Sequence, residues 1–245
     1  MIVMTEQSQD SSLRTNLRKV VPDLFLKERE IFLRLGPKAG PIYARLRLLD
    51  LVGVRTPRKV TITRAARSFL FVCFGNIMRS PMAEAMLKRA LADKGMQARV
   101  RVASAGLHAT PGKAAHPRAV AASLEIGLPL TSHRAQILTP GLASQADVIF
   151  AMDFQNKAEL LALFPEAQSK ILMLSAYRGL SSRYREIPDP YWGDLEATRL
   201  CYAVLQTCIA NLVAELSVSR MTDDHDGHQE ARDDAPSRGG TARDQ

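Results

Sequence analysis

The sequence predicts an α/β fold, with a four-stranded parallel sheet that has helices on both faces and is preceded by a helical N-terminal extension. Two observations carry this prediction. Between residues 68 and 218, four short apolar runs alternate with segments of helical periodicity, and strands joined in this way form a parallel sheet through right-handed crossovers. The chain also has 245 residues and 46% hydrophobic content, which is enough for a sizeable core.

The N-terminal extension covers residues 1–67 and contains two helical patterns. In the first, over residues 21–35, apolar side chains recur at helical spacing at Leu24, Phe25, Ile31, Phe32 and Leu35. The stretch "GPKAGP" at 36–41 breaks this pattern, and "IYARLRLLDLVGV" predicts a second helix after it. The following "RTPRKVTITRAARS" is either a basic linker or an added edge strand.

The basic character of the chain is concentrated in this extension. Residues 1–67 contain 14 Lys and Arg against 6 Asp and Glu, whereas the net charge of the whole chain is +8. The high isoelectric point therefore says little about the partner of the main domain, and we expect no nucleic acid. The apolar residues of the first helix need a covering surface, so we expect it to pack on the domain or on a second subunit. Docking to an acidic protein or to an anionic membrane surface is the alternative.

The main domain covers residues 68–218, and its elements follow in a regular order. Strands are expected at 68–74, 99–106, 146–152 and 170–176, and helices at 80–95, 116–127, 153–164 and 194–216. Residues 219–245 contain almost no apolar side chains, and this composition predicts a disordered polar tail.

The cysteines and the hydropathy exclude several classes of protein. Cys73, Cys201 and Cys208 form neither a C-x-x-C pair nor a Cys/His cluster of zinc spacing. We therefore expect no metal and no organic cofactor, and we interpret Cys201 and Cys208 as packing residues of the last helix. No stretch reaches about 18 consecutive apolar residues, and the first thirty residues lack the pattern of a signal peptide. A cytoplasmic location is expected.

The stretch "VCFGNIMRSPMAEA" places Cys73 at the end of the first strand and a helix start at Ser80. Ligands of such sheets bind beyond the carboxyl ends of the strands. Gly75 and Asn76 are the residue types that best tolerate a positive φ, so the loop can turn its N–H groups toward an anion. The helix N-terminus adds a positive dipole end. This context predicts a site for a phosphate-like dianion.

Two side chains of this loop suit phosphoryl chemistry. A thiolate at Cys73 would be stabilised by the same N–H groups and could serve as a nucleophile. Arg79 offers a planar fork of donors that can hold two phosphoryl oxygens. A buried strand cysteine is the simpler interpretation of Cys73 alone. The strand before it and the Ser-Pro helix start after it favour the functional one.

The loop resembles the signature of the low-molecular-weight protein tyrosine phosphatases, which have Cys, five residues, Arg and Ser near the chain start and an Asp-Pro pair far downstream. The second motif is present as "IPDPYWGD", with Asp189 before Pro190. The stretches "VASAGLHA", "SHRAQILT" and "DVIFAMDFQN" are also similar to the family. The resemblance spans about residues 68–216.

The resemblance implies a role for each residue of the motifs. Cys73 attacks phosphorus and forms a cysteinyl-phosphate, Arg79 and the loop bind the phosphoryl oxygens, and Asp189 protonates the leaving oxygen. Ser80 donates to the thiolate. The substrate is a tyrosine-phosphorylated protein. The expected substrate-binding residues are Phe74, Gly75, Asn76, Ile77, Met78, Ser80, Tyr191 and Trp192.

Two departures and three alternatives accompany this resemblance. Met78 stands where many members have a second cysteine, so Cys73 should be more open to irreversible oxidation, and members usually lack the extension. Arginine-phosphate phosphatases of the family typically have Thr where Ile77 stands, and an apolar residue beside aromatic ones suits a phenyl ring better. Arsenate reductases use further cysteines as a shuttle. A phosphate-binding module without turnover is the non-enzymatic alternative.

Overall fold

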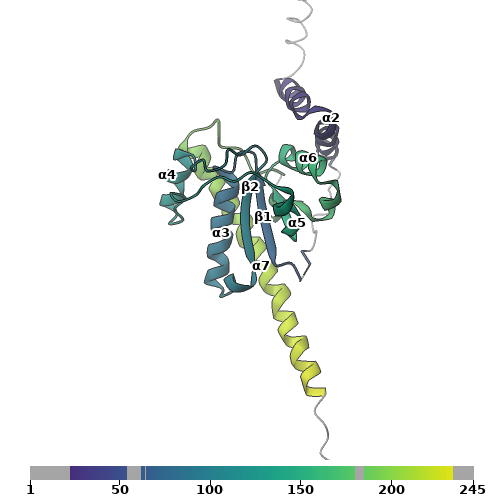
Figure 1. The fold of residues 1–245 in the computed structure, drawn as a ribbon, viewed down its shortest axis with the longest axis vertical. Coiled ribbons are helices and arrows are strands. Elements are labelled where there is room, and N and C mark those ends of the chain that lie inside the picture. The colour runs from purple at the N-terminus through teal and green to yellow at the C-terminus, as the bar shows by residue number, and fades with distance from the viewer. Residues whose placement is uncertain (1–22, 54–61, 64, 180–184, 234–245) are drawn as a thin grey trace, which may run out of the picture.

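A computed structural model describes residues 23–53, 62–63, 65–179 and 185–233. Figure 1 shows a central sheet with helices on both sides and a long helix that leaves the body of the molecule. The helices and strands, in chain order, are α2 (Asp23–Leu51), β1 (Ser68–Cys73), α3 (Arg79–Asp93), β2 (Arg101–Gly106), α4 (Pro117–Glu125), α5 (Pro140–Gln145), β3 (Val148–Ala151), α6 (Phe154–Leu163), β4 (Ile171–Met173) and α7 (Leu195–Asp233). Short 3-10 turns lie at Gln97–Arg99, Pro165–Lys170 and Leu174–Tyr177.

The four strands form one parallel sheet in the order β2-β1-β3-β4, as the alternation of apolar runs and helical segments predicts. Strand β1 lies in the interior and is buried along its whole length, which explains its unbroken apolar sequence. Phe69, Phe71 and Cys73 point into the core under α3, α4 and α7. Leu70 and Val72 point into the opposite core, under α5 and α6.

The strand order reverses direction between β1 and β3. From β1 the chain first adds β2 on one side, and later adds β3 and β4 on the other. The connections after β1 and β3 therefore run to opposite faces, and ligands of such sheets bind at this point. Cys73 ends β1, and Asp153 follows β3 by two residues, so the fold brings both to the edge where a site is expected.

The N-terminal extension contains one described helix, α2, and this helix packs on the domain. Ala39 and Tyr43 of α2 form a buried cluster with Phe154 and Ala158 of α6. The predicted break lies at Gly36 alone, with φ of 69°. The second helical segment thus begins at Pro37 rather than near residue 42, because proline fits the first position of a helix.

Two other predictions outside the sheet need correction. The sequence predicted a disordered tail from residue 219, but α7 continues to Asp233. Once a helix is nucleated in the core, each added residue gains a backbone hydrogen bond, so a polar sequence can continue it. Residues 234–245 lie outside the described part. Of the proposed linker or edge strand, Ile62 and Ala66 are buried in the main core and do not join the sheet, while residues 54–61 and 64 lie outside the described residues.

The first part of α7 is the core helix of the domain. Its buried side chains face β1 and α3 and include both cysteines, Cys201 and Cys208. The stretch Leu195–Ser217 is long and apolar enough to cross a membrane. Its packing under the sheet accounts for that composition. The short helix α5 was not predicted; Thr139 caps it by accepting a hydrogen bond from the N–H of Leu142.

Candidate active site

The loop between β1 and α3 turns at Asn76, which has a φ of 52°. This is the left-handed region that few residues other than Gly and Asn adopt readily. The sequence also suggested a positive φ at Gly75, and that expectation is wrong, since Gly75 is not among the residues with positive φ. Asn76 alone makes the turn that brings the chain from the strand to the helix.

Asn76 is fully buried and its side chain ties the loop to three other parts of the domain. Its amide nitrogen donates to the hydroxyls of Ser80 at 2.9 Å and Ser104 at 2.8 Å. Its amide oxygen accepts from the backbone N–H of Gln136 at 2.9 Å. The ring of His133 contacts the Asn76 carbonyl at 2.7 Å. These bonds confirm that Asn76 holds the loop in its turn.

Cys73 lies at the centre of this loop and is 3% exposed. Its sulfur is 3.0 Å from the hydroxyl of Ser80 and 3.3 Å from the backbone nitrogen of Asn76, which donates to it. Ser80 already accepts from the Asn76 amide, so its own hydrogen is free to point at the sulfur or at the Ala105 carbonyl, 3.3 Å away. A thiolate at Cys73 would favour the first arrangement.

The N-terminus of α3 points toward the same loop. No side chain caps it, and its first turn contains no acidic residue. The free N–H groups and the positive end of the helix dipole are thus available to an anion rather than satisfied internally. The start of α3 therefore has the groups that an anion site beside the Cys73 sulfur requires.

Arg79 begins α3, is 2% exposed and lies between two carboxylates. One terminal nitrogen donates to Asp153 at 2.6 Å and to the Ile187 carbonyl at 3.3 Å, and the other donates to Asp189 at 2.7 Å. Burial alone would lower the pKa of Arg79, but Asp153 and Asp189 raise it. The guanidinium stays charged and is fixed in direction.

Asp189 is the more open of the two carboxylates. Its side chain is 43% exposed, against 14% for Asp153. Its second oxygen accepts from the backbone N–H of Tyr191 at 3.2 Å. The structure thus brings the Asp-Pro motif to the Cys73 loop across 110 residues of sequence, and the exposed carboxyl can reach a bound ligand.

Asp153 has a role that the sequence analysis missed. Its position before a helical pattern indicates only a helix cap, and its side chain does accept from the N–H of Asn156 at the start of α6. Its other oxygen, however, holds Arg79. The available signal was its position, directly after a buried strand next to β1, where side chains gather at the sheet edge.

Two further supports of the loop were also missed. A Cβ atom at Gly106 would lie 2.8 Å from both the Asn76 nitrogen and the Phe74 carbonyl oxygen, so only glycine fits there. Ser104 is fully buried. Its hydroxyl donates a hydrogen bond to the carboxylate of Glu84 and accepts one from the side-chain amide of Asn76. The "VASAG" sequence of β2 carries both residues, but nothing in it indicates which loop they face.

The expected substrate-binding residues divide into exposed and buried groups. Phe74 is 45% exposed and stacks on His108, and Tyr191 is held by Arg118, which donates to its carbonyl at 2.6 Å. Trp192 is 90% exposed and contacts the Tyr191 ring edge-on. These rings can form walls for a ligand at the loop.

Ile77 and Met78, by contrast, are buried in the main core. The structure therefore corrects the expectation for Met78: its side chain, 3% exposed, cannot contact a substrate. The carbonyl of Ile77 accepts from the N–H of His116. Both apolar side chains pack in the main core.

Comparison with known proteins identifies the family to which the Cys73 loop and the domain around it belong. The family model for the low molecular weight phosphotyrosine protein phosphatases matches residues 68–221, which is more than half of the chain. The chain belongs to this family. The match begins at β1 and leaves out the N-terminal extension.

Relatives within this phosphatase family differ in substrate. The low molecular weight protein-tyrosine-phosphatase Wzb of Salmonella typhi is 36% identical over 137 residues, 56% of this chain and 85% of that protein. The protein-arginine-phosphatase of Bacillus subtilis is 32% identical over 151 residues, 62% of this chain and 97% of that protein. The structure of Wzb from Escherichia coli K30, in complex with sulphate, superposes with a TM-score of 0.56 at 31% identity and covers 62% of this chain and 99% of that one.

The remaining cysteines of this phosphatase lie away from solvent. Cys201 and Cys208 are fully buried in α7, and burial raises the pKa of each thiol to about 12. Both therefore stay protonated near neutral pH, which disfavours the thiolate shuttle of an arsenate reductase. In the ranges that the structure describes, no three His, Cys, Asp or Glu side chains are grouped so that they could hold a metal ion.

Proposed function

We propose that this chain hydrolyses phosphate monoesters and that its substrates are proteins phosphorylated on tyrosine. The observation that carries the proposal is the position of Arg79, which joins the Cys73 loop to Asp189. A nucleophile, a cation for the phosphoryl oxygens and an acid for the leaving group thereby meet at one helix N-terminus. The sulphate held by the related Wzb structure is a tetrahedral dianion of the same class.

The reaction has two steps. In the first, the Cys73 thiolate attacks phosphorus, the ester P–O bond breaks, and Asp189 gives its proton to the leaving oxygen. In the second, water attacks the cysteinyl-phosphate, its proton passes to Asp189, and the S–P bond breaks to return the thiolate. Ser80 donates its hydrogen bond to that thiolate, 3.0 Å away.

The contact between Arg79 and Asp189 suggests how binding prepares the acid. One terminal nitrogen of Arg79 is bound by Asp189, and the other is held by Asp153 and the Ile187 carbonyl. A phosphoryl group that enters the loop competes with Asp189 for the first nitrogen. The carboxyl so released is free to reach the leaving oxygen, while Asp153 keeps the guanidinium in place.

The exposed rings of Phe74 and Tyr191 favour phosphotyrosine over phosphoarginine, because they offer apolar walls for a phenyl group. Ile77 stands where the arginine phosphatases typically have Thr, but its side chain is buried and adds no further wall. The relationship to the Bacillus subtilis protein-arginine-phosphatase makes phosphoarginine the second candidate. A phosphate-binding module without turnover is disfavoured because Cys73, Arg79 and Asp189 are all present and gathered at one loop.

A turnover assay tests this proposal. We expect hydrolysis of 4-nitrophenyl phosphate at an unchanged rate in EDTA, because the proposed steps use no metal. We expect a higher kcat/KM on a phosphotyrosine peptide than on the same peptide with phosphoarginine. The reverse order would assign the chain to the arginine phosphatases, and no hydrolysis of either would favour the binding module.

A cytoplasmic location belongs to the same proposal. The described cysteines are all free thiols, and Cys73 acts only when reduced, which suits a reducing compartment. The docking of residues 1–67 to an acidic protein or an anionic membrane stays a prediction, because residues 1–22 lie outside the described part of the chain.

A further inference from the structure

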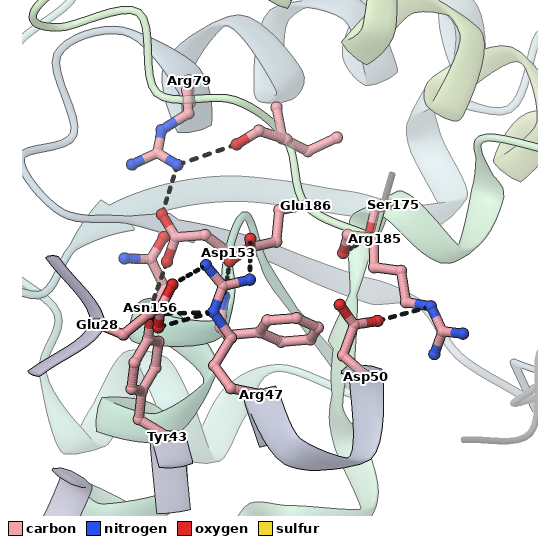
Figure 2. A network of polar contacts seen from close by, with 12 residues as sticks. Glu28, Tyr43, Arg47, Asp50, Arg79, Asp153, Asn156, Ser175, Arg185 and Glu186 are labelled. Atoms are coloured by element: carbon pink, nitrogen blue, oxygen red, sulfur yellow. Dashed lines mark hydrogen bonds and ion pairs between the residues drawn. The ribbon is translucent and has the colours of Figure 1, made fainter. Parts of the chain in front are cut away.

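The helix α2 contacts the segment that carries Asp189. Asp50 of α2 pairs with Arg185 at 2.8 Å, and Arg47 of α2 pairs with Glu186 at 3.0 Å. Figure 2 shows these two contacts side by side, with Arg79 and Asp153 next to them. The family match starts only at residue 68, so the family supplies no function for this helix.

Arg47 is held firmly on its own helix. Its guanidinium binds Glu28 through two nitrogens, at 2.6 and 3.0 Å, and also donates to the Tyr43 hydroxyl at 3.1 Å. It lies 5.6 Å from the centre of the Phe154 ring on α6. Four contacts from two helices fix the direction in which Arg47 reaches Glu186.

The segment after Glu186 leads to the active site through anchored residues. Glu186 accepts from the N–H of Phe154 at 2.8 Å. The backbone N–H of Ile187 donates to the Met152 carbonyl at 2.7 Å, and the Ile187 carbonyl accepts from Arg79. Asp189 follows two residues later and binds Arg79. Three residues of chain thus connect Glu186, the partner of α2, with the carboxyl of Asp189.

We propose that α2 is a positioning element of the catalytic site, in which Arg47 and Asp50 hold residues 185–189 so that Asp189 stays over the Cys73 loop. The inference rests on the proposed function, since it takes Asp189 as the general acid. Arg47 and Asp50 touch neither the loop nor a substrate. They act through Arg185 and Glu186.

The charges around Glu186 give this contact its strength. Burial raises the pKa of Glu186, and the charges of Asp153 and Glu28 raise it further, while the Phe154 N–H and Arg47 lower it. Without Arg47, a half-buried carboxylate would lose the cation that pairs with it and would still face the charges of Asp153 and Glu28. Such a group moves toward water, and the chain that carries Asp189 would move with it.

The test uses the full chain and compares Arg47→Met and Asp50→Asn with a matched control, Arg34→Met. Arg34 also joins α2 to α6, through Gln155, but makes no contact with residues 185–189. The kcat/KM, which reports only the first step, is measured on phenyl phosphate, whose leaving group needs a proton, and on 2,4-dinitrophenyl phosphate, whose leaving group does not. The variant Asp189→Asn is measured in parallel.

We expect Arg47→Met and Asp50→Asn to lower kcat/KM on phenyl phosphate by about 10-fold, the scale of a small misplacement of a catalytic group. The kcat/KM on the activated ester should fall less than about 2-fold, since proton donation contributes little there. Arg34→Met should change neither rate. Because Arg47→Met leaves carboxylates unpaired, Arg47→Met/Glu186→Gln is measured as well, and it should show the same substrate dependence.

Equal losses on both esters would mean that α2 supports the fold and not the acid, and unchanged rates would mean that it has no part in catalysis. Either result overturns the inference if Asp189→Asn shows the expected selective loss on phenyl phosphate. If Asp189→Asn itself affects both esters equally, the acid assignment fails, and with it both the proposed mechanism and this inference.

Discussion

Replacing Asn76 by alanine should destabilise the domain more than most single changes in a loop. The substitution removes three side-chain hydrogen bonds, two to buried serine hydroxyls and one from the N–H of Gln136. At about 1 kcal/mol each they amount to about 3 kcal/mol. Alanine at a φ of 52° adds about 1 to 2 kcal/mol, because its Cβ disfavours the left-handed region.

The variant Asn76→Gly separates these two contributions. Glycine loses the same hydrogen bonds but adopts the positive φ without a penalty. In urea unfolding we expect a loss of about 4 to 5 kcal/mol for alanine and about 1 to 2 kcal/mol less for glycine. Both should also lower kcat, since the Ser80 hydroxyl beside Cys73 loses its donor. Equal losses for the two variants, or a loss below about 1 kcal/mol for alanine, would refute the account of this turn.

Three other predictions follow from the described contacts. Arg79→Lys should lower kcat by about 100-fold or more, because an ammonium cannot reproduce the planar fork; near-normal turnover would mean that this loop is not the site. The backbone N–H of Arg67 lowers the pKa of Asp147, so its stabilisation is present above the unfolded pKa of about 3.9 and is lost as pH falls through the folded value. Asp147→Asn should therefore unfold at lower urea than the parent at pH 7 and at nearly the same urea near pH 2; a difference independent of pH would contradict this. Cys201 and Cys208, whose pKa values burial raises to about 12, should resist iodoacetamide at pH 8 in the folded protein and react in urea, as mass spectrometry would show.

The sheet and the chemistry of the loop were predictable from the sequence because both are local. The apolar runs mark β1 to β4, and the stretch from Cys73 to Ser80 combines a strand end, a turn residue and a helix start. The placement of Asp189 was predictable only through the family resemblance. An Asp-Pro pair alone gives no sign of the loop that it faces across 110 residues.

The contacts that were missed depend on tertiary packing. Asp153 caps α6 as its sequence indicates, but its contact with Arg79 follows from the neighbouring positions of β1 and β3 in the sheet. Likewise, Arg47 looks like a solvent-exposed charge on a helix. Only the packing of α2 on α6 brings it to Glu186. The length of α7 was underestimated because a polar composition does not prevent a helix that is already nucleated from continuing.

The most direct test of the account is the fate of the phosphoryl group. The protein is mixed with excess 4-nitrophenyl phosphate, quenched in acid within the first turnover, digested, and analysed by mass spectrometry. The account predicts a phosphate adduct on Cys73, a burst of nitrophenol equal to the enzyme concentration when the second step is slower, and loss of both adduct and turnover in Cys73→Ser. Turnover by Cys73→Ser above about 1% of the parent rate, or steady turnover of the parent with the adduct on another residue, would contradict it.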